Sequence, residues 1–255
     1  MYPINIEKLF SFWFDMEYGR GKVKSGKMVR RFIAKDGREF TLRIVQEGEL
    51  NRVRKLFTDI YREGDSAQWG RMAEKRRLYP SLFVGCFDNR KLVGAVVGWP
   101  EPKILAVHGI AVLEDYRRKG IGTALLESFD NAAEREGFDN FVLGAQWEAV
   151  PFYTSYGLSC FANAQIKPES IPWERIQTLR SKYKIIASIV FGPSPPSELV
   201  QRLARELKVS VGTVKSDFES VSIQISPTEI SKEALKTLRE DLNAYSTQFC
   251  FKKRL

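Results

Sequence analysis

Apolar residues follow two different periods through the middle of the chain. Residues 104–112 are almost all apolar, which is typical of a buried β-strand. Between about residues 120 and 136, apolar residues recur at helical spacing and form one face of a predicted helix. Residues 82–87 and 91–99 flank a short polar turn and predict an antiparallel hairpin. Strands and helices therefore occur together, which predicts an α/β (α+β) fold.

Further elements are predicted ahead of this core. Residues 28–34 and 39–45 bracket an Asp-Gly turn signal and predict a hairpin, and residues 47–61 carry apolar positions at helical spacing. The run 4–14 is apolar and aromatic but contains two charged residues. We expect it to form an amphipathic helix that packs on the core or makes the subunit contact of a homodimer. Residues 1–38 are thus predicted to be an N-terminal helix and hairpin-strand extension.

The part of the chain after Lys167 is punctuated by prolines, as linkers are. In one interpretation, four strands and two helices follow in the order β-α-β-β-α-β, the ferredoxin-like arrangement of many small ligand-sensing domains. This interpretation predicts a smaller C-terminal α+β domain at residues 171–255. The predicted strands are 184–191, 209–214, 221–226 and 247–252, and the predicted helices are 197–207 and 228–244.

A second interpretation of the same region is a helix-turn-helix over residues 203–214. Ala204 is small enough for two helices to cross there, and Ser210 could cap the second helix. Lys208 stands where a turn glycine is usual. The two interpretations differ in whether residues 209–214 form a strand or a helix, and only the second predicts contact with DNA.

Composition agrees with a soluble protein in a reducing compartment. The chain has 255 residues, 44% hydrophobic and 28% charged, which suffices for one full domain and a smaller partner. Its cysteines, Cys86, Cys160 and Cys250, are odd in number and widely spaced, so neither a disulfide framework nor a metal site is expected. No signal peptide or membrane span is indicated, and we expect a cytoplasmic protein.

The stretch 116–124, Tyr-Arg-Arg-Lys-Gly-Ile-Gly-Thr-Ala, joins the predicted strand 104–112 to the helix that follows. Gly120 and Gly122 let a ligand approach the backbone closely, where the first N–H groups of a helix have no partners within it. Three cations stand beside the glycines: Arg117, Arg118 and Lys119. Backbone N–H groups and cations together predict a site for a phosphate-bearing cofactor.

The pattern Arg117-x-x-Gly120-x-Gly122 resembles the coenzyme A signature of the GNAT superfamily of N-acetyltransferases, Gln/Arg-x-x-Gly-x-Gly/Ala. Residues 149–158 likewise resemble the family segment Ala-x-x-Phe/Leu-Tyr-x-x-x-Gly-Phe. With the order of predicted elements, the resemblance covers about residues 39–167. It implies the GNAT acyl-CoA N-acyltransferase fold, a mixed central sheet flanked by helices, in a domain at residues 39–170.

The resemblance also implies acetyl-coenzyme A (acetyl-CoA) as the cofactor. The strand segment from residue 110 to residue 112 would pair with the pantetheine arm, and the backbone of residues 118–123 would hold the pyrophosphate. Gln146 matches a position where the family often has an asparagine that contacts the cofactor. The cofactor-binding residues implied are Ile110, Ala111, Val112, Arg117, Arg118, Lys119, Gly120, Ile121, Gly122, Thr123, Gln146 and Phe152.

The resemblance makes Tyr153 the general acid that protonates the departing thiolate, with Tyr156 as the nearest alternative. The implied reaction is acetyl transfer to a primary amine by direct attack in a ternary complex, without a metal or an acyl-enzyme. Retention of Tyr153 favours an enzyme over a non-catalytic acetyl-CoA sensor, which would be a transcriptional regulator with a C-terminal helix-turn-helix.

The general base is less clearly indicated. Phe141 stands where some relatives carry a glutamate base, and it cannot take a proton. His108, the only histidine, precedes Ile110 by two residues, so alternation predicts that both lie on one face of the strand. Certain relatives that acetylate small amines use a histidine here as the base. An unperturbed histidine pKa of ~6.5 is suitable for that role. The carboxylate alternatives are Glu63, Asp65 and Glu148.

The acceptor site of the family lies between its first two helices, next to residues 61–69. Tyr61, Glu63 and Trp69 could bind an ammonium group there by charge and by ring face. The net charge of +9 is concentrated in the flanks: residues 1–38 carry nine basic and four acidic side chains, and residues 175–255 carry fourteen and eight. A slightly acidic core suits a cationic amine on a small molecule or a protein, whereas nucleic acid is a weaker explanation of the basic flanks.

Overall fold

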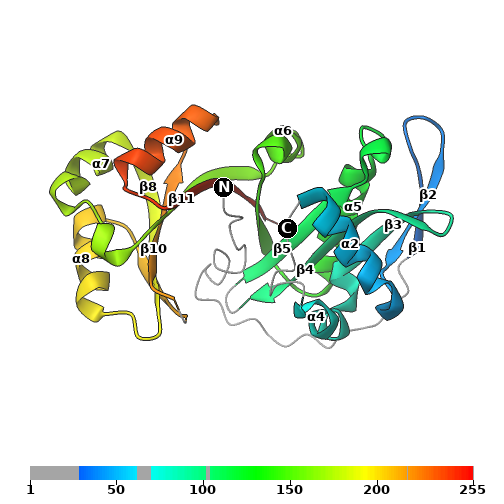
Figure 1. The fold of residues 1–255 in the computed structure, drawn as a ribbon, viewed down its shortest axis with the longest axis horizontal. Helices are drawn as coiled ribbons and strands as arrows, with labels where there is room; N and C mark the ends of the chain where they lie inside the picture. The colour runs from blue at the N-terminus through cyan, green and yellow to red at the C-terminus, as the bar shows by residue number, and fades with distance from the viewer. Residues whose placement is uncertain (1–28, 62–69, 102–103, 217, 255) are drawn as a thin grey trace. The chain divides into compact units, whose positions relative to one another are not determined.

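The computed structural model describes residues 29–61, 70–101, 104–216 and 218–254 (Figure 1). The chain divides into two compact units, Met1–Val142 with Arg254–Leu255, and Leu143–Lys253. These units divide the chain at a different place from the expected domains 39–170 and 171–255, whose independent folding stays a prediction. The predicted helix at 4–14 lies outside the described residues.

The first unit is built on strands that are neighbours in chain order, β1-β2-β3-β4-β5-β6. The first five are antiparallel to one another, whereas β6 runs parallel to β5, so the sheet is mixed as predicted. Both predicted hairpins form: β1 pairs with β2 around a left-handed Gly37, and β3 pairs with β4 around a left-handed Asn89. The strands are β1 (Val29–Ile33), β2 (Glu39–Ile44), β3 (Phe83–Asp88), β4 (Lys91–Glu101), β5 (Ile104–Val112) and β6 (Asn140–Gly144).

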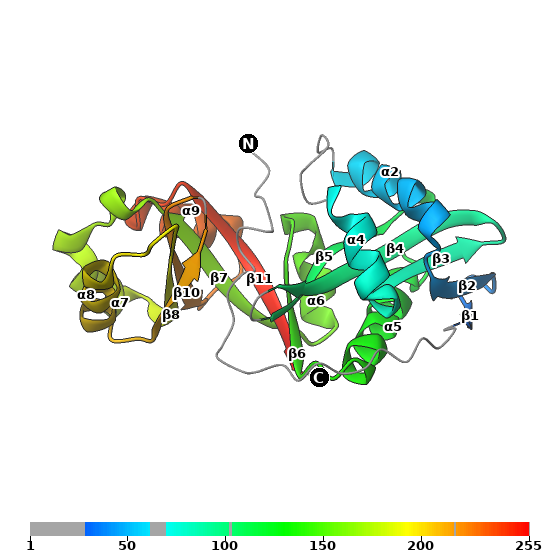
Figure 2. The same cartoon turned by 90° about the horizontal axis from the view of Figure 1, so that it is seen from below.

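Helices cover both faces of these strands, and Figure 2 shows β3, β4 and β5 running between α2 and α5. The missing side chain of Gly109 leaves room for the ring of Phe57 on α2, and that of Gly98 leaves room for Phe129 on α5. The apolar faces of both helices are buried, as their periodicity predicts. The helical elements are η1 (Glu47–Glu49), α2 (Leu50–Tyr61), α4 (Met72–Leu78), η2 (Pro80–Leu82), η3 (Glu114–Tyr116) and α5 (Ile121–Arg135).

The second unit has its own strands in the order β11-β7-β10-β8-β9. Helix α9 packs on the face formed by Ala162, Ile225 and Phe249. The strands are β7 (Ser159–Ile166), β8 (Lys184–Gly192), β9 (Val211–Lys215), β10 (Ser220–Ser226) and β11 (Ser246–Arg254). The helical elements are η4 (Trp147–Ala149), α6 (Val150–Ser155), η5 (Pro168–Ser170), η6 (Trp173–Arg175), α7 (Ile176–Lys182), α8 (Ser197–Leu207) and α9 (Lys232–Asp241).

The order β-α-β-β-α-β predicted for the C-terminal region is confirmed, and α8 has the predicted bounds. The helix-turn-helix is wrong, because residues 211–215 form strand β9, which pairs in parallel with β8. The ferredoxin-like arrangement is also wrong. It places another strand between the two parallel strands, whereas β8 and β9 pair directly and β7 lies between β10 and β11. Within the described part of the chain, every helix is too short or too polar to cross a membrane.

Candidate active site

Among the described residues, one edge of strand β5 pairs with another strand only near its beginning. β5 and β6 are in register at Leu105 with Phe141 and at Ala106 with Val142, near the beginning of β5. Further along, the N–H and the carbonyl of Ile110 both bond to a side chain, that of Tyr61, so they point away from β4. Because successive residues of a strand point their peptide groups to opposite edges, those of Val112 point the same way as those of Ile110.

Ala111 differs from its two neighbours in this respect. Alternation directs its N–H and carbonyl toward β4, and the next residue of that set, Leu113, donates its N–H to Val93 at 2.9 Å. Of the three strand residues predicted to pair with the pantetheine arm, Ile110 and Val112 therefore face the open edge, whereas Ala111 faces β4.

A β-bulge lies at His108. Val97 is opposite Gly109 and Gly98 is opposite Val107, so His108 is an extra residue on β5. The imidazole stacks on the Trp99 indole, with ring centroids 3.7 Å apart and an interplanar angle of 11°. Trp99 shares its face of β4 with Val97, and hence with Gly109. The prediction that His108 shares a face with Ile110 is therefore wrong, because the bulge interrupts the alternation between them.

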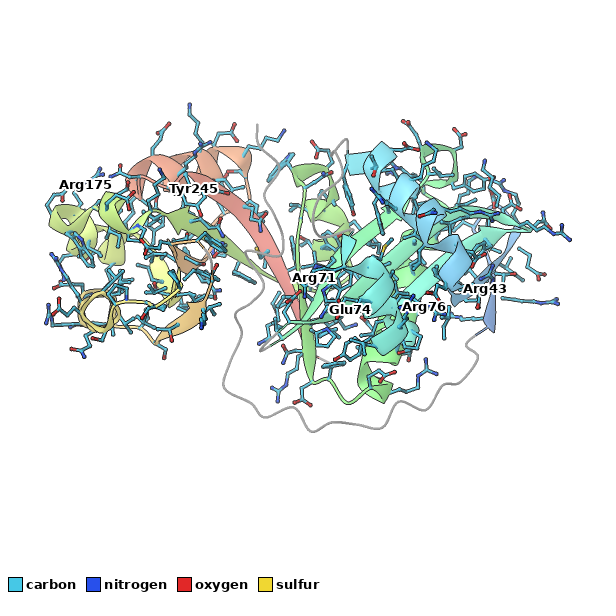
Figure 3. All side chains as sticks on the ribbon, turned by 60° about the horizontal axis from the view of Figure 1, so that its bottom comes forward. Arg43, Arg71, Glu74, Arg76, Arg175 and Tyr245 are labelled. Atoms are coloured by element: carbon cyan, nitrogen blue, oxygen red, sulfur yellow. The ribbon has the colours of Figure 1, made fainter. Side chains whose placement is uncertain are left out.

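Glu101, at the end of β4, is the partner of His108 that sequence reasoning missed. Its Oε1 lies 3.4 Å from His108 Nε2 and accepts the indole N–H of Trp99 at 2.9 Å. Arg71, at the N-cap of α4 (Figure 3), lies 3.9 Å from the same oxygen. The available signal was periodicity, since positions 99 and 101 share a face of one strand. A carboxylate at the end of such an apolar strand needs a buried partner.

Burial and these contacts fix the charge states of the pair. Burial lowers the pKa of His108; Glu101 opposes this effect, and the charges of Arg71 and Lys75 add to it. Burial raises the pKa of Glu101, but bonding and charge from His108, the charge of Arg71 and the Trp99 indole outweigh it, so the pKa lies below its usual value. The direction of each shift favours a neutral imidazole beside an ionised carboxylate.

The turn that joins β5 to α5 adopts a left-handed backbone at two positions, Arg118 with φ 64° and Gly120 with φ 87°. Helix α5 begins at Ile121, and its N-cap residue, Gly120, has no side chain that could cap it. The N–H groups of the first turn have no acceptor within the helix. A Cβ on Gly120 would lie 3.2 Å from the Phe32 ring, which covers this glycine from β1. The geometry is that of an anion-binding backbone turn.

The three cations predicted at this turn have different surroundings. Lys119 Nζ lies 2.7 Å from Asp36 Oδ2, and that hydrogen bond is the main reason why the pKa of Asp36 falls to about 2. The Arg117 Nε–H donates to the Val112 carbonyl at 3.2 Å on the open edge of β5. Arg118 is exposed, and no polar partner for it is found among the described residues. Arg118 is thus the cation most available to a ligand.

Tyr61 is the described member of the predicted acceptor site, since Glu63 and Trp69 lie outside the described residues. Its hydroxyl donates to the Ile110 carbonyl at 2.8 Å and accepts the Ile110 N–H at 3.0 Å. Its ring stacks on Phe57, with centroids 5.7 Å apart. Tyr61 is therefore brought to the same strand segment that was predicted to bind the cofactor.

The remaining predicted residues belong to the second unit. Tyr153 is buried on α6, with ring centroids 5.1 Å from Phe152 and 5.3 Å from Phe251. Gly157 has φ 87° just after α6, which explains the glycine of the Tyr-x-x-x-Gly pattern. Gln146 is exposed at the N-cap of η4. The roles of Tyr153, Phe152 and Gln146 beside the cofactor stay predictions.

Three further positions considered for the general base or the general acid lie within the described residues. Phe141 is buried and meets Phe129 edge to face at 5.5 Å, so its position belongs to the core between β6 and α5. Glu148 is exposed on η4, and Asp65 lies outside the described residues. Tyr156, the alternative acid, has Lys253 Nζ 4.6 Å from its ring centroid.

Comparison with known proteins identifies the first part of this arrangement. Residues 50–158 match the model of the acetyltransferase (GNAT) family. The predicted fold class, a GNAT fold with a mixed central sheet flanked by helices, is confirmed. The uncharacterized N-acetyltransferase YjcF of Bacillus subtilis (strain 168) is 30% identical over 86 residues, 34% of this chain. The match spans 61% of that protein, less than two thirds of its length.

Solved structures resemble the chain more distantly. Ard1 from Thermoplasma volcanium aligns with a TM-score of 0.43 and 17% identity over 74% of this chain and 98% of that one. Arabidopsis thaliana Naa50, in complex with the bisubstrate analogue CoA-Ac-MVNAL, has a TM-score of 0.43 and 20% identity over 52% of this chain and 89% of that one.

Proposed function

We propose that this chain is an N-acetyltransferase that moves an acetyl group from acetyl-CoA to a primary amine. One observation carries the proposal. The edge of β5 on which Ile110 faces away from β4 leads, through a left-handed turn at Gly120, into the N-terminus of α5, whose N-cap residue is this glycine. A strand edge can pair with the amides of a pantetheine arm, and a helix N-terminus can hold a pyrophosphate. The site thus suits both ends of one molecule, an acyl-CoA.

The residues that would hold acetyl-CoA fit it chemically. The N–H and carbonyl groups of Ile110 and Val112 face the edge away from β4, and an extended amide-bearing arm could pair with them in place of the Tyr61 hydroxyl and the Arg117 guanidinium. The N–H groups of residues 121–123 and the Arg118 guanidinium offer donors for phosphate oxygens. A side chain on Gly120 would meet the Phe32 ring, so the glycine keeps this turn compact. When bound, acetyl-CoA supplies the activated acyl group, and the Ile110 edge polarises its carbonyl.

His108 and Glu101 handle the proton of the acceptor. Glu101 Oε1 lies 3.4 Å from His108 Nε2, which favours the tautomer protonated at Nε2 and leaves Nδ1 as the basic nitrogen. His108 is fully buried, so the proton of an incoming ammonium reaches the pair through a relay rather than by direct contact. Tyr153 holds the proton that the departing sulfur needs. An amine and a thioester held together need no further activation by a metal.

The alternative function, a DNA-binding regulator, rested on the helix-turn-helix that strand β9 replaces. The buried pair His108 and Glu101, whose pKa values are both shifted, favours a catalytic role over a sensing one. The acceptor is a primary amine on a small molecule or a protein.

The experiment that tests the proposal is an acceptor screen on the full chain. Free thiol released from acetyl-CoA is followed with polyamines, amino acids, lysine peptides and peptides with free N-termini, and calorimetry measures cofactor binding. We expect micromolar to millimolar binding and thiol release with at least one amine class. A chain that binds no acetyl-CoA in calorimetry contradicts the proposal.

A further inference from the structure

The side chain of Tyr61 occupies both hydrogen-bonding groups of one residue on the open edge of β5. The hydroxyl accepts the Ile110 N–H at 3.0 Å and donates to the Ile110 carbonyl at 2.8 Å. Both distances are those of ordinary hydrogen bonds. A hydroxyl can serve as donor and acceptor at once, so one atom does here what a peptide group of a neighbouring strand would do.

The position of Tyr61 is fixed by packing as well as by these bonds. Tyr61 is the last residue of α2, and its ring stacks on Phe57 at an interplanar angle of 11°. Phe57 in turn lies over Gly109, where a Cβ would be only 3.0 Å from its ring. The glycine next to Ile110 therefore admits Phe57, and Phe57 holds the tyrosine with its hydroxyl at the strand edge.

An extended acyl-pantetheine arm would need the same two groups. Under the proposed function, on which this inference rests, the arm pairs with the N–H and carbonyl of Ile110. One N–H cannot make two full hydrogen bonds, so the arm and the Tyr61 hydroxyl exclude each other at this residue.

We propose that the Tyr61 hydroxyl and the acyl-CoA arm compete for the Ile110 edge of β5, so that acyl-CoA binds by displacing the Tyr61 hydroxyl. Tyr61 is then a residue that sets cofactor affinity, in addition to bordering the acceptor site. The displaced hydroxyl becomes available beside the acyl group only after the cofactor has entered. Closure of the edge also protects the exposed strand from pairing with another chain.

The test compares Tyr61→Phe with the full wild-type chain and with Tyr79→Phe as a matched control. Tyr61→Phe keeps the ring on Phe57 and removes only the competing hydroxyl. Tyr79 lies in the same unit, at the C-cap of α4. Calorimetry with acetyl-CoA should give binding roughly threefold to thirtyfold tighter for Tyr61→Phe, the value of one or two net hydrogen bonds. Tyr79→Phe should match the wild type.

Amide hydrogen exchange at Ile110 gives a second measurement that does not depend on the cofactor. We expect slow exchange in the free wild type, faster exchange in free Tyr61→Phe, and slow exchange again once acetyl-CoA is added. Equal exchange in the two free proteins, or unchanged or weaker affinity in Tyr61→Phe, overturns the inference. If neither the wild type nor the variants bind acetyl-CoA but the exchange rates differ, the proposed function is wrong. The bond between Tyr61 and Ile110 is then still supported.

Discussion

At the scale of residues, Glu101 and His108 each stabilise the other in its buried position. Burial alone disfavours an ionised carboxylate and a protonated imidazole. The Trp99 indole and the nearby Arg71 keep Glu101 charged, and Glu101 holds the imidazole against Trp99. A neutral base beside a fixed negative charge can take up a proton at neutral pH without leaving an unpaired buried charge. The chemistry of the pair therefore depends on four side chains rather than on the histidine alone.

The pH dependence of the rate tests this pair. Since burial lowers the pKa of His108, the imidazole stays neutral somewhat below pH ~6.5, and the acidic limb of kcat/KM should have its midpoint below that value. Glu101 raises the pKa of His108, so Glu101→Gln should move the limb to still lower pH and reduce the rate. His108→Gln should abolish the limb. A limb that is the same in all three proteins shows that the pair takes no part in proton transfer.

Tyr153→Phe should lower turnover by roughly 10- to 10⁴-fold with little change in acetyl-CoA affinity, as the loss of a general acid does. The substitution keeps the ring that contacts Phe152 and Phe251, and circular dichroism checks that the fold is retained. Tyr156→Phe is the matched control on the same short segment. If Tyr156→Phe slows the reaction and Tyr153→Phe does not, the assignment of the acid is reversed.

Most of these residues could be identified from the sequence, but the contacts between them could not be predicted. Gly120 could be assigned to the turn because only a glycine tolerates such a backbone easily. The face of His108 could not be predicted, because a bulge depends on how β5 aligns with β4. Glu101 was missed for the same reason, since its contact with His108 joins two strands. Local patterns therefore predict positions, whereas contacts between strands decide which side chains meet.

At the scale of elements, the β1–β2 hairpin supports the cofactor turn. Phe32 of β1 covers Gly120, Lys35 donates its N–H to the Lys119 carbonyl at 3.4 Å, and Asp36 pairs with the Lys119 ammonium. These contacts hold the turn between β5 and α5 from the side of the hairpin. The extension predicted from an Asp-Gly turn signal is thus part of the candidate site.

Gly120→Ala tests this support. The left-handed backbone strains any side chain, and the new methyl would press on Phe32, so we expect a loss of stability of about 1–3 kcal/mol and weaker acetyl-CoA binding. Gly137→Ala is the matched control, because Gly137 has φ 83° with open space around it at the far end of α5. Thermal unfolding and calorimetry on both variants separate the two effects. Equal losses of stability and unchanged affinity in both would show that Phe32 does not matter.

The elements of the second unit show where local patterns stop being sufficient. Helix α8 had the bounds that its apolar spacing predicts, because its apolar face is continuous and Lys208 ends it in a left-handed conformation. Residues 211–215, Val-Gly-Thr-Val-Lys, fitted both a strand and a recognition helix. They form a strand because they pair with β8, and a local sequence pattern cannot predict pairing with a distant segment.

At the scale of the whole molecule, β7 determines where the chain can be divided. The segment was predicted to end the GNAT domain near residue 170, and the family match ends at residue 158. In the structure, β7 pairs with β10 on one edge and with β11 on the other, and both partners come later in the chain. The second unit therefore cannot be removed by cutting after β7 without exposing both edges of that strand.

A chain ending at residue 167 should accordingly fail to fold into a stable monomer. It would keep β7, whose residues from Phe161 to Ile166 are buried, but would lose both neighbouring strands. Strands with unpaired edges and apolar faces associate, so we expect aggregation in size-exclusion chromatography and reduced secondary structure in circular dichroism. A chain ending at residue 158 is the control, because it lacks β7 with its two unpaired edges and should be the more soluble of the two. A monomeric, folded chain ending at 167 that binds acetyl-CoA would show that residues 39–167 fold independently of the strands that pair with β7.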